Sequence, residues 1–239
     1  MSLATGLWVY LSTGPLLWLT LTLAAYAVAD GIARAFKRHP LANPVLIAVA
    51  LVIAALEVSR TPFPVYFEGA QFVHFLLGPA TVALAIPLVE NWERVKRSAV
   101  PILIALVAGS LTAIVSAVGI AALFGAPRPI LASIAEKSVT TPIAMGISEK
   151  IGGIPSLTVV LVILTGVIGA IMVTPLMNAL RIRDYAARGF AAGVASHGIG
   201  TARAFQVNDL AGTFSGLAMG LNGILTALIL PLLAQLFGG

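Results

Sequence analysis

Side chains that could do chemistry gather in one polar stretch, residues 195–203, which reads Ala-Ser-His-Gly-Ile-Gly-Thr-Ala-Arg. The stretch carries an imidazole, a guanidinium and two hydroxyls, and it lies between two segments apolar enough to cross a membrane. Inside a bilayer, charge and irregular backbone are tolerated only where protein or water surrounds them. We therefore expect a binding site here rather than a loop.

Arg203 and His197 are the first candidates in this stretch. A guanidinium remains charged, and its planar fork fits a carboxylate or a phosphate. The structural alternatives are an ion pair of Arg203 with Asp209, Glu136 or Glu57, or extension of its side chain to the membrane interface. His197 could relay a proton that is coupled to transport, since imidazole titrates near neutral pH. The alternative for His197 is a packed, hydrogen-bonded ring.

Gly198 and Gly200 weaken any helix through the same stretch. A break there would direct the amino end of a half-helix into the site, and such an end attracts anions. Ser196 and Thr201 add hydroxyl groups beside it.

A second polar cluster precedes Pro142. Serine and threonine favour the cap of a helix and proline favours its first turn, so a half-helix is expected to begin here. Capping accounts for hydroxyls but not for a neighbouring ammonium group, for which an interface pair with Glu136 is the alternative. The candidate site residues of this cluster are Lys137, Ser138, Thr140 and Thr141.

Two candidates lie outside these clusters. Thr81 belongs to another interrupted apolar segment, where Gly78 and Pro79 break the run. Asn222 lies in the last apolar segment, and its alternative role is to hold helices together by hydrogen bonds.

The composition predicts a membrane protein. Of 239 residues, 59% are hydrophobic and 10% are charged, against about 25% charged in soluble domains. The net charge of +5 comes from short basic clusters between apolar runs, which is typical of cytoplasmic loops and not of a nucleic-acid surface. With no cysteine and three scattered histidines, we expect neither a metal site nor a cofactor.

The fold class predicted is an all-α, polytopic membrane protein. About seven spans are expected, at residues 7–29, 44–58, 71–89, 100–124, 154–180, 185–205 and 210–237, with residues 128–153 as a re-entrant or interrupted helix. If residues 128–153 return to their own side, the basic clusters at 34–39, 94–97 and 181–183 share one face. The amino terminus would then be outside and the carboxyl terminus inside. If residues 128–153 cross instead, Arg181 and Arg183 lie outside.

This arrangement predicts inverted repeats within a single transmembrane domain, 1–239. Residues 1–40 would form the first span and a basic loop, 41–127 the first repeat, 128–153 the re-entrant segment and 154–239 the second, inverted repeat. Residues 78–84 faintly resemble residues 198–204, and both lie in interrupted segments. Discontinuous helices that meet near the midplane indicate the binding site of a secondary transporter. We also expect a homodimer, because short spans such as 44–58 gain from packing.

The chain resembles the LrgB/CidB membrane protein family. The resemblance rests on residues 71–85, 137–145, 152–158, 195–204 and 214–224, and it covers nearly the whole chain. Glu136 departs from it, since many relatives are expected to have proline there. The resemblance implies a multi-pass protein of the bacterial inner membrane, with two possible roles. One is antiholin-like control of autolysis and murein hydrolases, with a small LrgA/CidA-like membrane partner; the other is carboxylate transport, as in the related plastidic glycolate/glycerate carrier.

From these residues we expect a proton-coupled carrier of small monocarboxylates such as glycolate or glycerate, working by alternating access. Arg203 would bind the carboxylate, and the remaining candidates would complete the site. The alternative is a holin-like protein that acts by oligomerising or through a partner. An enzyme is disfavoured, because adjacent residues such as Ser196 and His197 point about 100° apart on a helix and do not form a catalytic pair.

Overall fold

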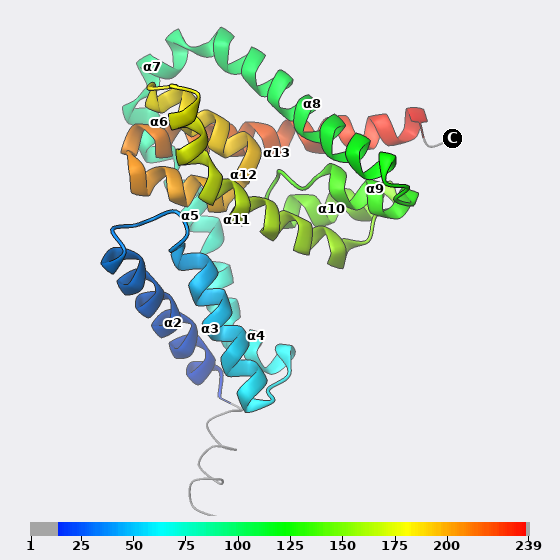
Figure 1. Cartoon of the computed structure of the whole chain (residues 1–239). Helices are drawn as coiled ribbons and strands as arrows, with labels where there is room; N and C mark the ends of the chain where they lie inside the picture. Colours follow the sequence, from blue (N-terminus) through cyan, green and yellow to red (C-terminus); the bar gives the residue numbers. More distant parts are fainter. Residues whose placement is uncertain (1–13, 238–239) are drawn as a thin grey trace, which may run out of the picture. The chain divides into compact units, whose positions relative to one another are not determined.

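The computed structural model describes residues 14–237, without the side chains of residues 77, 81, 236 and 237. Within these residues every regular element is a helix (Figure 1), which confirms the all-α prediction. Five helical segments are long and apolar enough to cross a membrane: Pro15–Ala35, Phe63–Glu90, Ala99–Leu123, Pro155–Ala179 and Asp209–Gln235. The chain divides into two compact units on either side of the Ala85–Ile86 bond.

The first unit contains α2 (Pro15–Ala35), α3 (Pro44–Ser59), α4 (Phe63–Phe75) and α5 (Leu77–Ala83). Asn43 caps α3, because its Oδ1 accepts the backbone N–H groups of Val45 and Leu46. Helices α2 and α4 approach closely at Gly69, where an added Cβ would lie 2.1 Å from the carbonyl oxygen of Pro15. Outside its cap, α3 buries only Pro44 within the chain. The remaining side chains of α3 are half-buried or exposed.

The second unit is built on three long helices, α8 (Ala99–Leu123), α11 (Pro155–Ala179) and α13 (Asp209–Phe237). Its shorter helices are α6 (Ala85–Glu90), α7 (Trp92–Arg97), α9 (Arg128–Ala135) and α10 (Thr141–Ile151), together with the interrupted α12 (Tyr185–Val207). A buried cluster joins α7, α8, α12 and α13, formed by Val95, Ile102, Leu106, Phe190, Val194, Phe214 and Ala218.

Helices α9 and α10 form a hairpin. Arg128, at the start of α9, and Ile151, at the end of α10, line one cavity with Leu230. Ala135 and Ile147 pack together further along the same two helices. Residues 128–151 therefore return to the end at which they start. We call the turn, residues 136–140, the first tip.

Helix α12 forms a second hairpin, because its backbone reverses at His197. That residue has φ 40° and ψ −135° inside an otherwise helical segment. A Cβ added at Gly200 would lie 2.9 Å from the carbonyl oxygen of Ala192, whereas eight residues of straight helix span about 12 Å. The second half, residues 198–207, therefore folds back on the first, residues 185–196, and residues 196–198 form the second tip. The prediction of a break at 196–203 is confirmed, and the prediction of one span over 185–205 is wrong.

The two hairpins open toward opposite ends of this unit. Gly189, near the open end of the second hairpin, packs on Ala211 at the start of α13. The open end of the first hairpin lies beside Leu230, near the end of α13, and nineteen residues of helix separate these levels by about 28 Å. Each tip therefore points toward the middle of the unit.

The basic clusters at 94–97 and 181–183 lie at one end of the unit. Arg94 Nη2 is 3.2 Å from Asp184 Oδ2, which brings the two clusters together, as the charge pattern predicted. Helix α13 begins at this end and finishes at the other. The end of α13 therefore lies opposite Arg183 within this unit, because the reversal at His197 removes one crossing. The side of the membrane that each end faces stays a prediction, and both chain termini lie outside the described residues.

Candidate functional site

The two tips meet at Asn222, a residue of α13 that is 1% exposed. Its Nδ2 donates to the carbonyl oxygen of Ser138 in the first tip at 3.2 Å and to that of Val194, just before the second tip, at 3.1 Å. Carbonyls next to a helix break have lost their intrahelical partners, so these bonds satisfy groups that would otherwise be buried and unpaired. One amide group thus holds both tips.

The acceptor side of Asn222 is occupied as well. Ser110 Oγ, on α8, donates to Asn222 Oδ1 at 2.5 Å, and Thr226 Oγ1 lies 3.5 Å from the same atom. The residue therefore links α8, α13 and both hairpins. The sequence interpretation of Asn222 as an amide that joins helices is confirmed.

His197 is packed and hydrogen-bonded. Its Nε2 lies 2.9 Å from the carbonyl oxygen of Val162 and therefore carries a proton, because that oxygen can only accept. The ring fits against Gly166 of α11, where an added Cβ would be 2.7 Å away. A non-glycine residue with positive φ stores about 1–3 kcal/mol of strain. The geometry fits the structural alternative given for this residue, and its role in proton coupling stays a prediction.

The hydroxyls of the second tip serve packing. Thr201 Oγ1 lies 2.9 Å from both the carbonyl oxygen of His197 and Ser215 Oγ of α13. Ser196 is 1% exposed and presses against Gly169 of α11. Both hydroxyl groups are enclosed by helices. The polar groups that remain accessible at the second tip are therefore those of its backbone.

The first tip carries a positive charge. Lys137 is half-buried, and its Nζ donates to Ser138 Oγ at 3.0 Å. Its ammonium group also lies within electrostatic range of the His197 ring in the second tip. The half-buried residues Thr140 and Thr141 follow, and Thr140 occupies the cap position of α10 without a hydrogen bond from its side chain to the first-turn amides.

Both tips present the amino end of a helix. Helix α10 begins at the first tip, and the second half of α12 begins at the second tip. Unpaired N–H groups and the helix dipole make each of these ends favourable for an anion. Together with Lys137, they place three sources of positive potential around the tips, which suits a small anionic ligand.

Four further predicted site residues are Arg203, Gly198, Gly200 and Thr81. Arg203 lies six residues beyond His197, about 9 Å along the helix; it is half-buried, and its Nη1 lies 3.4 Å from Gln206 Oε1. Gly198 has open space around it, the nearest atom to an added Cβ being Met219 Sδ at 3.8 Å. Gly200, in contrast, is needed for close packing of the two halves of α12. The side chain of Thr81 lies outside the described residues, so the prediction for it stays as it was.

The sequence interpretation missed the environment of Glu136. This residue is 0% exposed, its Oε1 lies 3.3 Å from Thr158 Oγ1, and its Oε2 has no hydrogen-bond partner. A signal was available, because a carboxylate beside a lysine in an apolar region requires either a partner or a proton.

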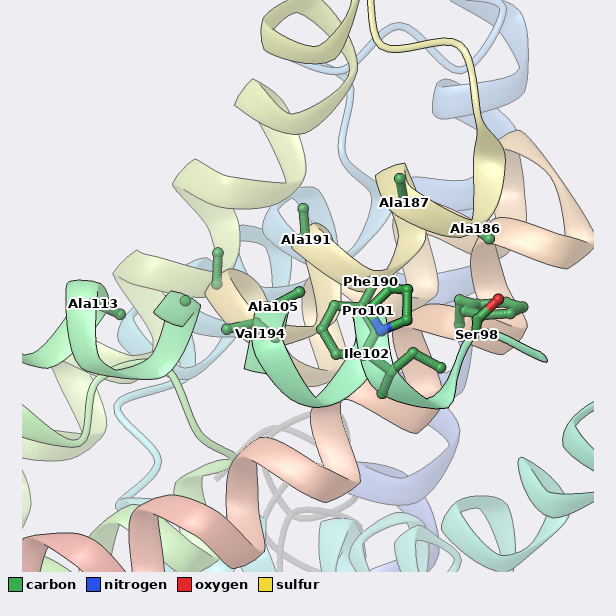
Figure 2. A pocket seen from close by; sticks show the side chains of 13 residues that line it. Ser98, Pro101, Ile102, Ala105, Ala113, Ala186, Ala187, Phe190, Ala191 and Val194 are labelled. Atoms are coloured by element: carbon green, nitrogen blue, oxygen red, sulfur yellow. The ribbon is translucent and has the colours of Figure 1, made fainter. Parts of the chain in front are cut away.

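The cavity drawn in Figure 2 lies beside this site and has a different character. It has a volume of about 430 Å³ and lies between α8 and the first half of α12 (Figure 2). Ile102, Phe190 and Val194 line it with several alanines and Ser98, and no charged side chain is among its lining residues. An apolar cavity of this kind does not suit an organic anion.

Comparison with known proteins gives a family. The sequence model of the LrgB-like family matches residues 22–236. The uncharacterized protein YxaC of Bacillus subtilis (strain 168) is 38% identical over 91% of this chain and 94% of its own length. The uncharacterized protein YwbG of the same strain is 36% identical over 90% of this chain and 95% of its own length. The antiholin-like protein LrgB of Bacillus mycoides (strain KBAB4) is 30% identical over 94% of this chain and 97% of its own length. No solved structure matches the chain.

Proposed function

Starting from the fact that the chain belongs to the LrgB-like family of membrane proteins, we propose that it is a secondary carrier of small monocarboxylates, such as glycolate, glycerate or related 2-hydroxy and 2-oxo acids. The observation that carries the proposal is the meeting of two helix hairpins, opened toward opposite ends of one unit, at a pair of tips held by Asn222. Each tip begins a half-helix, and the first tip adds an ammonium group.

The substrate class follows from this chemistry. The substrate carboxylate binds between the two helix amino ends, with Lys137 as its countercharge. The backbone of Gly198, which has open space beside it, and the hydroxyls of Thr140 and Thr141 bind the neighbouring oxygen of a 2-hydroxy or 2-oxo acid. Arg203, two turns along from the second tip, attracts the anion on the path from the basic end of the unit.

The hairpins also give the protein its two gates. In many transporters a central site is flanked by discontinuous helices related by inverted topology. Here the pair formed by the first hairpin and α11 corresponds to the inverted pair formed by the second hairpin and α13. Opening one tip at a time exposes the site to one side of the membrane and then to the other.

Uptake of radiolabelled glycolate into liposomes that contain the purified protein tests the proposal. We expect saturable uptake that unlabelled glycerate and lactate compete for, and at least a tenfold loss in Lys137→Met, which corresponds to about 1.4 kcal/mol of binding or barrier. The matched control is Lys150→Met, an exposed lysine at the other end of the same hairpin. Equal uptake in both variants contradicts the proposed site.

A second function is favoured by the names of the relatives. The name antiholin-like belongs to a relative 30% identical over nearly the whole chain, and none of the relatives named above carries the name of a transported substrate. These names support the antiholin-like function better than they support carboxylate transport. That function predicts control of membrane permeability through self-association or a membrane partner. Release of glycolate and of a neutral sugar alcohol at equal rates, without saturation, would identify it in the same liposomes.

A further inference from the structure

Glu136 is a buried carboxyl group that the substrate site does not use. It ends α9 and begins the first tip, one residue before Lys137. None of its surface reaches solvent, and no ion pair to it occurs among the described residues. The neighbouring lysine bonds instead to Ser138.

The surroundings of Glu136 are hydroxyl groups without charge. Thr158 of α11 contacts Oε1, and Ser148 of α10 lies 2.8 Å from the Thr158 hydroxyl. Helices α8 and α11 contain no ionisable side chain, α9 contains only Arg128 at its far end, and the ionisable residues of α10, Glu149 and Lys150, are exposed. On α13 the only ionisable residue in the described part is Asp209 at its start. The ionisable residues of α12 are Tyr185, Arg188, His197 and Arg203, of which His197 lies in the second tip.

An ionised carboxylate in this place leaves Oε2 buried with neither a donor nor a countercharge. Such a group is costly unless it is neutralised. A bound metal cation would neutralise it, but the network is tightly packed: a Cβ added at the adjacent Gly153 would lie 2.3 Å from Ser148 Oγ. Lys137, the next residue, also repels a second cation. A proton needs no space and places no further charge in the tip.

We propose that Glu136 is the proton-binding residue of this carrier, and that one proton bound there travels with each monocarboxylate. The proposal rests on the proposed function. In the loaded state the carboxylate of Glu136 forms an O–H bond with the proton, while the substrate carboxylate faces Lys137. On release, that O–H bond breaks and the proton passes to water on the side to which the first tip opens. The cargo, one anion with one proton, carries no net charge.

The position of Glu136 explains how the proton is coupled to movement. When Glu136 is neutral, the first tip stays closed over Asn222. When it ionises, the charge requires water or the ammonium group of Lys137, and both require the tip to open. Loss of the proton therefore opens the gate at which the substrate leaves.

Liposome transport with Glu136→Gln tests the coupling. For the parent protein, an inward proton gradient drives glycolate accumulation, and a potential set with potassium and valinomycin leaves the rate unchanged. For Glu136→Gln, which mimics the neutral acid and so keeps the first tip closed, we expect loss of gradient-driven accumulation and of exchange of internal for external glycolate, while glycolate still raises the unfolding temperature of the variant in detergent. Glu149→Gln, exposed on the same hairpin, should behave like the parent. Gradient-driven accumulation by Glu136→Gln at the parent level overturns the proposal.

An infrared measurement separates this proposal from the proposed function. Between about pH 5 and about pH 9, the parent protein and Glu149→Gln should lose a carbonyl band of a protonated carboxylic acid that Glu136→Gln lacks throughout. Absence of a difference between the parent and Glu136→Gln overturns the proton site, whatever the transport result. If the band is present but no carboxylate is taken up, the carrier function fails and the proton site stands.

Discussion

At the residue scale, the site depends on a few buried polar groups whose partners come from distant parts of the chain. The sequence could identify His197, Lys137 and Asn222 as polar residues in an apolar chain, since such residues are rare in membranes. It could not identify their partners. The bond from Asn222 to Ser138 spans 84 residues and that from His197 to Val162 spans 35, and no local pattern encodes either.

Asn222→Ala tests whether the amide of Asn222 holds the two tips together. The variant leaves the carbonyls of Ser138 and Val194 and the hydroxyl of Ser110 without their partner, so we expect a loss of about 1–3 kcal/mol in the free energy of unfolding. Thermal unfolding in detergent measures it. Ser116→Ala, which removes an exposed hydroxyl bonded only within α8, should stay within about 0.5 kcal/mol of the parent. An unchanged unfolding temperature for Asn222→Ala would refute the stabilising role of the Asn222 amide.

At the element scale, the chain achieves its two reversals differently. The first hairpin turns through a five-residue tip that ends at Thr140, and the sequence predicted the start of α10 from Thr140 and Pro142. The second hairpin turns at one residue. The sequence predicted a break near Gly198 and Gly200, but the residue with positive φ is His197. Propensity favours glycine there, and the packing of the ring against α11 overrides it.

His197→Gly and His197→Ala separate the backbone from the side chain. Both remove the hydrogen bond to Val162, but only glycine adopts φ 40° without strain. We expect His197→Gly to be more stable than His197→Ala by about 1 kcal/mol, the reverse of the order in a regular helix. Ala202→Gly, at an exposed helical position, should show the ordinary order and lose stability. If His197→Ala is the more stable variant, residue 197 is helical and the hairpin is refuted.

The two glycines of this hairpin should respond differently to an added methyl group. Gly200→Ala brings Cβ to 2.5 Å from Ser196 Cβ and 2.9 Å from the carbonyl oxygen of Ala192, so the halves of α12 must separate. We expect a loss of about 1–3 kcal/mol from overpacking. Gly198→Ala finds only Met219 at 3.8 Å and should be tolerated. Equal unfolding temperatures for the two variants would contradict the folded-back arrangement.

At the scale of the whole molecule, hydropathy and charge predicted an all-helical membrane protein, because these signals are read locally along the chain. They could not distinguish a span from a hairpin. Residues 185–205 have the length of a span, and only the contacts of Gly189 with Ala211 and of Gly200 with Ala192 reveal the reversal. The same applies to the basic end of the second unit. The clusters at 94–97 and 181–183 were predicted to share a face, and they do, but the carboxyl end of α13 lies opposite.

Single-cysteine labelling tests this topology, and the chain offers a cysteine-free background. Arg183→Cys lies at the basic end of the second unit and Lys150→Cys at the open end of the first hairpin; both positions are exposed. Because basic clusters face the cytoplasm, a membrane-impermeant maleimide should label Lys150→Cys in intact cells and label Arg183→Cys only after permeabilisation. The parent chain gives the background signal. Labelling of both positions from the same side would mean that α11 does not cross the membrane between residues 150 and 183. That result would rule out the opposed hairpins on which the two gates depend.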